Sequence, residues 1–257
     1  MKFARFALKA DGSIKQAVLR EQTLYVIEGD IFGLWKYKGS SYDLNEVTLL
    51  APLEPHSIIG VGKNYIAAGE TKPEQLPKVP VFFYKPVTSV IGPEADIVIP
   101  SGVSEVKFES ELVVVIGKQA RNIQEQEALD YVFGYTIAND VTAPQFNHPD
   151  GHWTVSKSFD TFTPLGPYLE TELDLQQIRV QAQHNGTRKQ DSELELMILS
   201  IPFLISYLSR VLTLQPGDVI LSGSPAGAEF MAAGELIECQ IDGIGILRNS
   251  TVAPPQS

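Results

Sequence analysis

The chain has 257 residues, of which 44% are hydrophobic and 20% charged, a composition that argues against disorder and allows one large domain plus a small one. Because 31 acidic residues outnumber 20 basic ones, the net charge of -11 disfavours binding to nucleic acid or to anionic membranes. The single cysteine, Cys239, cannot form an internal disulfide, and no apolar leader or membrane-spanning run stands out, so we expect a soluble cytoplasmic protein.

The first 54 residues predict a small β subdomain. Short runs of β-prone residues alternate with turn signals at Asp11-Gly12 and Gly29-Asp30, where glycine and aspartate tolerate turn dihedrals. The strands expected here are 3–8, 16–19 and 23–28. A connector rich in proline then leads to a larger domain, which we expect to cover residues 55–252 and to end in a loose tail, 253–257.

The next segment predicts three short strands around a polar stretch. The strands are 57–62, 79–85 and 89–91, and Pro86 and Pro93 confine the last two to short or edge positions. Residues 66–78 contain two prolines and many polar side chains, so we predict a mobile lid there.

Two carboxylates begin the strongest strand signal, which runs from Val106 to Gly117. Because side chains alternate along a strand, Glu109 and Glu111 project to one side while Phe108 projects to the other. The apolar run that follows indicates burial on both faces. Buried like charges need protons or a cation to offset their repulsion, so the pair predicts a metal or a shared proton.

Three further elements follow. Asn122 with Glu125 matches a helix-capping pattern and predicts a short helix before a strand at 132–139. Apolar residues at helical spacing predict one clear helix that starts near Ser200, with Pro202 in its first turn. A strand at 219–221 precedes a final hairpin around Asp242-Gly243.

Glu109, Glu111 and Asp140 are three carboxylates at the ends of two neighbouring strands, joined by a helix long enough for a crossover. All-oxygen ligand sets suit hard cations such as Mg²⁺ and Mn²⁺. The same spacing also suits acids that are simply solvated at strand ends, since Asp and Glu are mostly exposed.

Other polar residues have two interpretations each. Lys157 is either a surface lysine or a cation that binds a substrate carboxylate or enolate beside the metal. Gly223 and Ser224 lie either in a plain turn or in a backbone anion cradle, and the loop lacks the Gly-x-Ser-x-Gly pattern of serine hydrolases. His148 and His152 lie in a turn-rich loop, where they serve either the surface or catalysis.

Several ordered motifs together make the chain resemble the fumarylacetoacetate hydrolase superfamily. The motifs are Phe108-Glu109-Ser110-Glu111-Leu112, Gly134-Tyr135-Thr136-Ile137-Ala138-Asn139-Asp140-Val141, Lys157-Ser158-Phe159-Asp160 and Gly223-Ser224-Pro225-Ala226-Gly227. The resemblance implies an α+β, predominantly β fold, in which a mixed β-roll with flanking helices follows a small N-terminal β subdomain, and it implies a homodimer. It also implies that Glu109, Glu111 and Asp140 ligate Mg²⁺ or Mn²⁺, that Lys157 faces the substrate and that the Ser224 loop contributes to anion binding.

The chain departs from that family at three places. Many members carry a His and a Glu that activate water from the lid, where this chain has Ala68 and Thr71, and Glu70 is the nearest replacement for the Glu. Members commonly bind the distal end of the substrate with an Arg and a Gln, where this chain has Pro144 and Asn147. We therefore expect a different distal pocket, to which Asn147 contributes. Ser224 stands where a Thr is usual, so the hydroxyl is kept.

Members of the family cleave C–C bonds of acylpyruvates, decarboxylate oxaloacetate-like acids or isomerise unsaturated 2-hydroxy diacids. We therefore expect a divalent-metal-dependent enzyme that acts on a small 2-oxo or β-diketo acid, with the cation stabilising an enolate. C–C bond hydrolysis needs an activated water, for which His148, His152 and Glu70 are candidates, whereas decarboxylation needs only the metal and an electrostatic sink. The alternatives are an isomerase with Lys157 or a loop histidine as proton shuttle, and a non-catalytic protein that binds metal and small acids.

Overall fold

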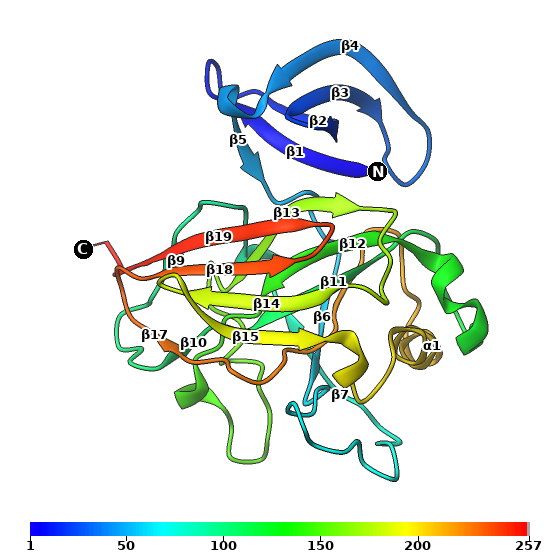
Figure 1. The fold of residues 1–257 in the computed structure, drawn as a ribbon, viewed down its shortest axis with the longest axis vertical. Helices are drawn as coiled ribbons and strands as arrows, with labels where there is room; N and C mark the ends of the chain where they lie inside the picture. Colours follow the sequence, from blue (N-terminus) through cyan, green and yellow to red (C-terminus); the bar gives the residue numbers. More distant parts are fainter. Residues whose placement is uncertain (256–257) are drawn as a thin grey trace.

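The computed structural model describes residues 1–255, and strands dominate it (Figure 1). They form a twelve-stranded sheet, a five-stranded sheet and a two-stranded ribbon. This architecture confirms the predicted α+β, predominantly β fold. Among the described residues, no helix has the length and apolarity needed to cross a membrane.

The N-terminal strands stand apart from the rest of the chain at the top of Figure 1. They are β1 (Lys2–Leu8), β2 (Ile14–Arg20), β3 (Thr23–Gly29), β4 (Trp35–Asp43) and β5 (Val47–Leu50), with the short 3₁₀ helix η1 (Leu44–Glu46) before β5. The β1 strand pairs with β13 (Thr163–Glu170) only through Lys2 and Phe3, which lie opposite Glu170 and Leu169. This short pairing links the N-terminal strands to the main sheet.

The remaining strands and helices form the body of the molecule. The strands are β6 (Ile58–Gly62), β7 (Val81–Lys85), β8 (Val90–Ile91), β9 (Ile97–Val98), β10 (Val106–Lys107), β11 (Ser110–Ile116), β12 (Val132–Asn139), β13, β14 (Arg179–His184), β15 (Thr187–Glu193), β16 (Val219–Leu221), β17 (Phe230–Met231), β18 (Leu236–Ile241) and β19 (Gly245–Val252). The helices are α1 (Ile201–Val211) and the 3₁₀ helices η2 (Val87–Ser89), η3 (Glu125–Tyr131), η4 (Pro144–Phe146) and η5 (Leu194–Leu196).

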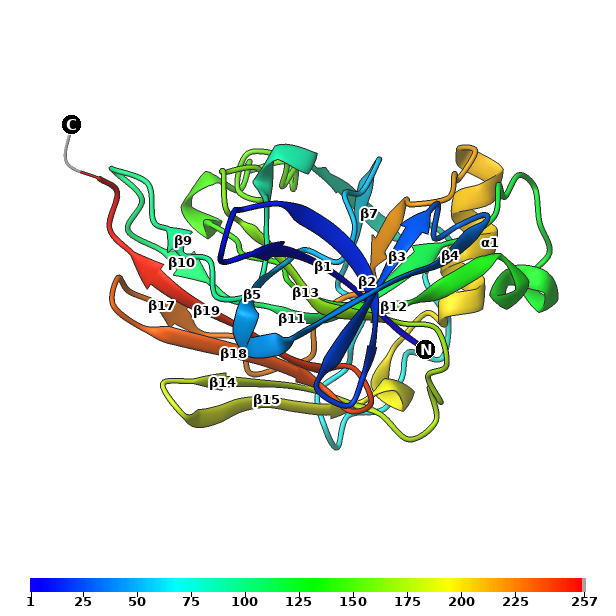
Figure 2. The ribbon, with the colours of Figure 1, turned by 90° about the horizontal axis from the view of Figure 1, so that it is seen from above.

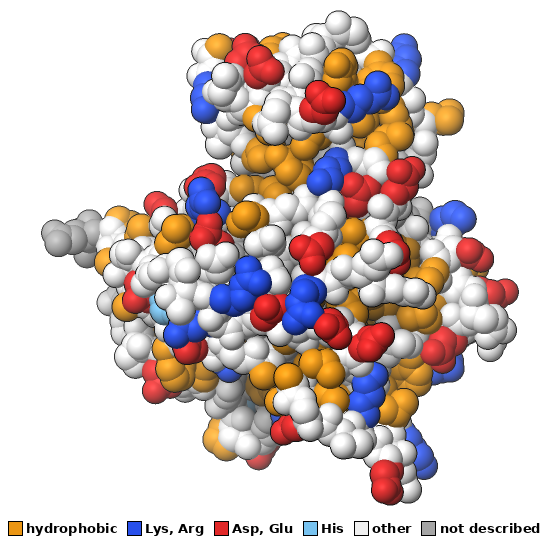
Figure 3. Space-filling model, in the orientation of Figure 1, with side chains coloured by type: hydrophobic (Ala, Val, Ile, Leu, Met, Phe, Trp, Pro, Cys, Tyr) orange, Lys and Arg blue, Asp and Glu red, His pale blue; other side chains and the backbone are white. Residues whose placement is uncertain are grey.

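The β11 strand lies in the interior of the large sheet. The sheet order is β4-β3-β2-β1-β13-β12-β11-β16-β6-β7, so β11 is flanked by β12 and β16, and β7 forms one edge. The five-stranded sheet, β15-β14-β18-β19-β9, packs against β11 and β12, as Figures 1 and 2 show. On the face shown in Figure 3, acidic and basic side chains are interspersed rather than gathered by sign.

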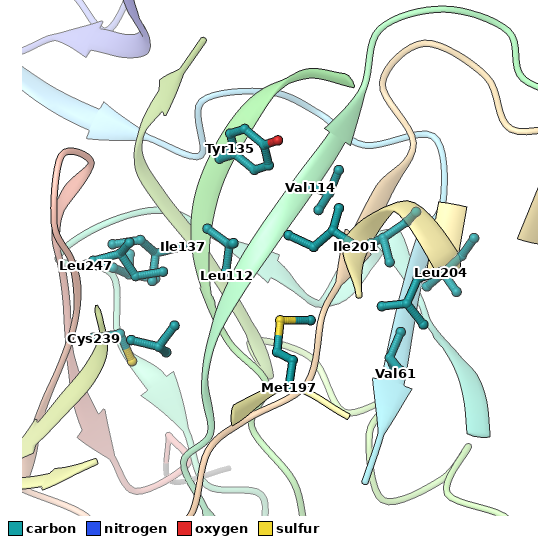
Figure 4. Packing of buried hydrophobic residues seen from close by; sticks show 14 of the residues in the cluster. Val61, Leu112, Val114, Tyr135, Ile137, Met197, Ile201, Leu204, Cys239 and Leu247 are labelled. Carbon is teal, nitrogen blue, oxygen red and sulfur yellow. The ribbon is translucent and has the colours of Figure 1, made fainter. Parts of the chain in front are cut away.

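Both faces of β11 are buried, as its continuous apolar run predicts. Leu112 and Val114 belong to a hydrophobic cluster with Ile201 and Leu204 of α1 and with Cys239 of β18, part of which is drawn in Figure 4. Val113 and Val115 belong to a second cluster on the opposite face. Burial on both sides fixes the register of β11, because a slip of one residue would exchange its two faces.

Two expected elements are confirmed closely. The predicted helix is α1, and the Ser200 hydroxyl caps its start by accepting a hydrogen bond from the Phe203 N–H at 3.2 Å. The final hairpin is β18 and β19, with Ile241 opposite Gly245 around the Asp242-Gly243 turn. Both agreements rest on local signals that need no tertiary context.

Three expectations about the segment around β11 are wrong. The strand predicted from Val106 to Gly117 is interrupted, because the N–H of Phe108 donates to the Glu229 carbonyl at 3.3 Å and the N–H of Glu109 to Asn139 Oδ1 at 2.9 Å. The capping pair is Gln124 and Glu127 rather than Asn122 and Glu125, although the expected short helix itself is present as the 3₁₀ helix η3. The expected crossover is wrong as well, since β11 and β12 pair antiparallel.

Candidate metal centre and active site

Antiparallel pairing of β11 and β12 brings the three predicted carboxylates together. Ser110 lies opposite Asn139, so the start of β11 meets the end of β12, and the Asp140 N–H donates to the Glu109 carbonyl at 2.8 Å. One oxygen each from Glu109, Glu111 and Asp140 lies within 4.8 Å of the others. A parallel crossover would have placed Asp140 at the far end of β11, so the antiparallel register makes this cluster.

Two lysines compensate the negative charge of this cluster. Lys157 Nζ donates to Glu109 Oε2 at 2.7 Å and to Asp140 Oδ2, and its side chain is only 5% exposed. Lys85 Nζ lies 2.7 Å from Asp140 Oδ1 and donates to the Val141 carbonyl at 3.2 Å. Asp140 is therefore held between two buried ammonium groups.

Burial and charge act on the protonation of these groups in opposite directions. Burial raises the pKa of Glu111 well above its usual value, and the neighbouring Asp140 adds to this effect. Burial alone would also raise the pKa of Asp140, but the ammonium groups of Lys157 and Lys85 outweigh it and lower the pKa. Burial alone would lower the pKa of Lys157, but Asp140 and Glu109 reverse this and raise it, so Lys157 carries its charge.

The loop after β16 holds Glu111 from the other side. The N–H of Gly223 donates to Glu111 Oε2 at 2.6 Å. Gly223 has a φ of 104°, and a Cβ there would lie 2.8 Å from the Cβ of Asn64, so only glycine fits. The predicted anion cradle therefore contacts a carboxylate of the cluster in this structure.

Gln190 of β15 ties this loop to β11. Its Nε2 donates to Ser224 Oγ at 2.8 Å and to the Pro225 carbonyl at 2.6 Å, and its Oε1 accepts from the Ser110 N–H at 2.9 Å. Gln190 is fully buried, and its bonds to Pro225 and Ser110 form away from water, while the bond to Ser224 is partly buried beside the cavity. The Ser224 hydroxyl is thereby oriented beside the carboxylates.

A cavity of about 320 Å³ opens over the carboxylates. Its lining residues come from five separate segments of the chain, and they are Val61, Gly62, Lys63, Phe83, Lys107, Glu109, Glu111, Asp140, Thr142, Pro144, Asn147, Trp153, Lys157, Ser224, Pro225 and Ala228. The volume suits a small organic acid.

Two aromatic rings form one wall of this cavity. Phe83 and Trp153 meet edge to face with ring centroids 5.8 Å apart. Each ring lies on a glycine of β6, since a Cβ on Gly60 would come within 2.1 Å of Phe83 and one on Gly62 within 2.0 Å of Trp153. The Lys157 ammonium lies 4.9 Å from the Phe83 ring centroid, so the aromatic wall also stabilises the positive charge of Lys157 by a cation–π interaction.

The structure gathers some of the predicted site residues and leaves others outside. Asn147, Lys157 and Ser224 line the cavity together with the three carboxylates. His148 is exposed beside Asp150, and His152 is also exposed, and neither lines the cavity. Glu70 is exposed and accepts a hydrogen bond from the Ala67 N–H at 3.0 Å. A catalytic role for any of these three would require movement of its loop.

Lys85 and Gln190 were not predicted, although each carries a weak signal. Lys85 lies two residues after Phe83 on β7, and both are buried in an otherwise more exposed strand, which is the alternation expected of an inward-facing lysine. Gln190 and Ser192 are likewise the two buried positions of β15. In neither case does the sequence alone say which face is buried.

The residues present fit a hard divalent cation. All three donors are carboxylates, and Asp140 Oδ1 is buried without a hydrogen bond of good geometry. Burial and the neighbouring carboxylates hold the pKa of Glu111 well above its usual value, and a bound cation would relieve this repulsion. Oxygen ligands of this kind suit Mg²⁺ and Mn²⁺.

Comparisons with known proteins identify the family of the chain. A family model described as Fumarylacetoacetate (FAA) hydrolase C-terminal matches residues 57–252, and one described as Rv2993c-like, N-terminal matches residues 1–52. The chain is 38% identical over 221 residues to an oxaloacetate tautomerase, mitochondrial, from Xenopus laevis, covering 81% of this chain and 69% of that protein.

Two solved structures are similar over nearly the whole chain. A 5-carboxymethyl-2-hydroxymuconate delta-isomerase from Mycobacterium smegmatis superimposes with a TM-score of 0.92 at 35% identity, covering 99% of this chain and 100% of that one. A maleylpyruvate hydrolase from Sphingobium sp. SYK-6, in complex with manganese (II) ion and pyruvate, has a TM-score of 0.82 at 27% identity, covering 98% and 99%.

Proposed function

The chain belongs to the fumarylacetoacetate hydrolase family, and from this membership we propose that it is a divalent-metal-dependent enzyme that interconverts the enol and keto forms of a small 2-oxo acid. Glu109, Glu111 and Asp140 would hold the cation. When bound, Mg²⁺ or Mn²⁺ draws electron density from the carboxylate and carbonyl oxygens of the 2-oxo acid and so stabilises its enolate.

The side chains around the cluster support the same chemistry. Lys157 stays charged between Glu109 and Asp140, where it stabilises negative charge that develops on a substrate oxygen. Ser224 and Asn147 supply polar groups that orient the acid. The aromatic wall of Phe83 and Trp153 excludes water from one side of the substrate.

One observation favours enol–keto interconversion over hydrolysis of a C–C bond. Among the described residues that line the cavity there is no histidine, and the exposed His148 and His152 lie outside it. Hydrolysis needs a group that activates water, whereas tautomerisation needs stabilisation of the enolate and transfer of one proton. The names of the relatives from Xenopus laevis and Mycobacterium smegmatis, a tautomerase and an isomerase, support the same choice.

A substrate panel with Mg²⁺ or Mn²⁺ tests this proposal. We expect the native protein to accelerate ketonisation of enol-oxaloacetate above the rate with metal alone, and chelation to abolish the effect. Replacing Glu109 by Gln should reduce the rate about a hundredfold or more, because it removes one anionic ligand. The matched control is Glu105→Gln, which changes an exposed acid four residues upstream and should leave the rate unchanged.

The panel also separates the other reactions. Faster pyruvate formation from oxaloacetate would indicate decarboxylation, and cleavage of acylpyruvates would indicate C–C hydrolysis. Either of these as the dominant activity would contradict the proposal. If no substrate of the panel is turned over while calorimetry still detects Mn²⁺ binding, the protein binds metal and small acids without catalysis, and the proposal is wrong.

A further inference from the structure

The cavity over the carboxylates contains several lysines in a protein whose net charge is -11. Lys63, Lys107 and Lys157 all line it, and the acidic residues that line it in the described part of the chain are the three carboxylates of the cluster. Together with the buried Lys85, these lysines and a divalent cation would outweigh the three carboxylates. In a cavity with that surplus of positive charge, a second negative charge on the ligand would add to its binding.

The lysines occupy different positions along the aromatic wall. Lys157 lies 4.9 Å from the Phe83 ring centroid at the carboxylate cluster, and Lys63 Nζ lies 6.0 Å from the ring of Trp153. Because Phe83 and Trp153 are in contact, the wall connects the two ammonium groups. A linear molecule lying along the wall would have one end at each lysine.

Lys63 is the lysine of this cavity that is available for a ligand. Lys157 is bound by Glu109 and Asp140, and Lys107 lies 3.9 Å from Glu109 Oε1. Lys63 is exposed and forms no ion pair with any carboxylate among the described residues. Pro144, which lines the same cavity, offers no hydrogen-bond donor to an anion.

The backbone holds Lys63 at this place in an uncommon conformation. Its φ is 57°, in the left-handed region, where a lysine without a special reason is rarely found. The next residue, Asn64, is buried and anchors the turn by donating to the carbonyls of Ser222 and Leu199 at 2.8 and 3.1 Å. A strained position kept beside a cavity is typical of a functional residue.

From these contacts we propose that Lys63, placed over Trp153, binds the distal carboxylate of a linear 2-oxo diacid. The oxo-acid end of that molecule lies at the carboxylate cluster and Lys157, and its carbon chain lies along Phe83 and Trp153. The proposal rests on the function proposed above, and it assigns to Lys63 the preference for dicarboxylic over monocarboxylic 2-oxo acids. Asn147 adds a polar side chain to the same cavity.

Tryptophan fluorescence offers a binding assay that does not depend on turnover. The chain has two tryptophans, and a Trp35→Phe background leaves Trp153, in the cavity, as the only one. The probes are 2-oxoglutarate and 2-oxopentanoate, which have equally long carbon chains and differ in the distal carboxylate, each titrated into protein saturated with Mg²⁺.

In the Trp35→Phe protein with Lys63 intact, we expect 2-oxoglutarate to bind about tenfold more tightly than 2-oxopentanoate, a preference that weakens with added salt. Lys63→Met should weaken binding of 2-oxoglutarate about five- to tenfold and leave 2-oxopentanoate within about twofold. Lys63→Arg should keep the preference, because it keeps the charge. Lys78→Met removes one exposed positive charge that does not line the cavity and should change neither affinity.

Three results would overturn the proposal. The first is equal affinity for the two probes when Lys63 is intact. The second is a preference for 2-oxoglutarate that is unchanged in Lys63→Met, and the third is loss of that preference in Lys107→Met instead. In each of these cases 2-oxo acids still bind, so the proposed function stands. If neither probe binds in the presence of Mg²⁺ while Mg²⁺ itself binds, the proposed function fails together with this inference.

Discussion

At the scale of single residues, the site depends on how charge is compensated around Asp140. This carboxylate is fully buried and lies between Lys85 and Lys157, whose side chains are 0% and 5% exposed. A buried charge without a partner costs several kcal/mol, so each lysine supports the fold as well as the site. Glu111, by contrast, accepts a hydrogen bond from the backbone N–H of Gly223, where Asp140 has lysine side chains as partners.

Replacing Lys85 by Met should therefore destabilise the protein strongly. We expect a loss of about 3–5 kcal/mol in the free energy of unfolding, because one oxygen of Asp140 loses its buried counter-charge. Urea denaturation without added metal measures this change. Lys118→Met is the control, since Lys118 is exposed, and should stay within about 0.5 kcal/mol of the native protein. An equal, small effect of both substitutions would contradict the role given to Lys85.

The sequence predicted the anionic half of the site better than the cationic half. Glu109, Glu111 and Asp140 stand next to strongly apolar strands, so their burial can be read from their neighbours. Lys85 follows a strand with mixed polarity, and its partner Asp140 is 55 residues away along the chain. Such a pair is decided by the order of strands in the sheet, which local patterns do not specify.

At the scale of elements, α1 shows how a local signal fixes a boundary. Ser200 accepts the Phe203 N–H, Pro202 occupies the first turn, and Leu204, Ile205 and Leu208 are buried against the core. The helix therefore begins at one defined residue and presents one apolar face.

Ser200→Ala should lower the free energy of unfolding by about 1 kcal/mol, because one N–H at the start of α1 loses its acceptor. Ser200→Asp keeps an oxygen acceptor at the cap and should stay near the native value. Thermal or urea unfolding monitored by circular dichroism compares the three proteins. A loss in Ser200→Asp as large as in Ser200→Ala would argue that Ser200 acts through packing and not as a cap.

Hairpins show both the reach and the limit of local signals. Asp242-Gly243 predicted the turn between β18 and β19, and Asn185-Gly186, which joins β14 and β15, carries a hairpin signal of the same kind. Asn185 and Gly186 have φ values of 49° and 76°, as a turn with two left-handed residues requires. By contrast, β4 is mostly exposed and has no alternation from which it could be predicted.

At the scale of the whole molecule, the large sheet ends in an uncovered strand. The β7 strand is its outermost strand on one side. We name the exposed apolar side chains on it and just beyond its two ends the β7 edge surface: Val79 (70% exposed), Val81 (40%), Tyr84 (55%) and Val87 (45%). Unpaired sheet edges with apolar side chains favour association with another chain. We expect a homodimer that uses the β7 edge surface.

Size-exclusion chromatography with light scattering tests this assembly. The native chain should elute with twice its mass of 28.2 kDa, and Val81→Glu combined with Tyr84→Glu should give a folded monomer. Ile14→Glu, which alters an exposed apolar residue of β2, should remain dimeric. A native monomer, or a dimer that survives the double substitution, would exclude the β7 edge surface as the contact.

The two glycines beneath the aromatic wall have a consequence for how relatives of this protein diverge. Any change of Gly60 or Gly62 introduces a Cβ that displaces Phe83 or Trp153. Mutations at these two codons therefore reshape the wall, whichever amino acid they introduce. The next residue, Lys63, already has a Cβ, and its side chain is exposed. Its replacement therefore introduces no new atom against either ring. With the role proposed above for Lys63, substitutions at this one position would change which acids are bound while Gly60 and Gly62 are kept.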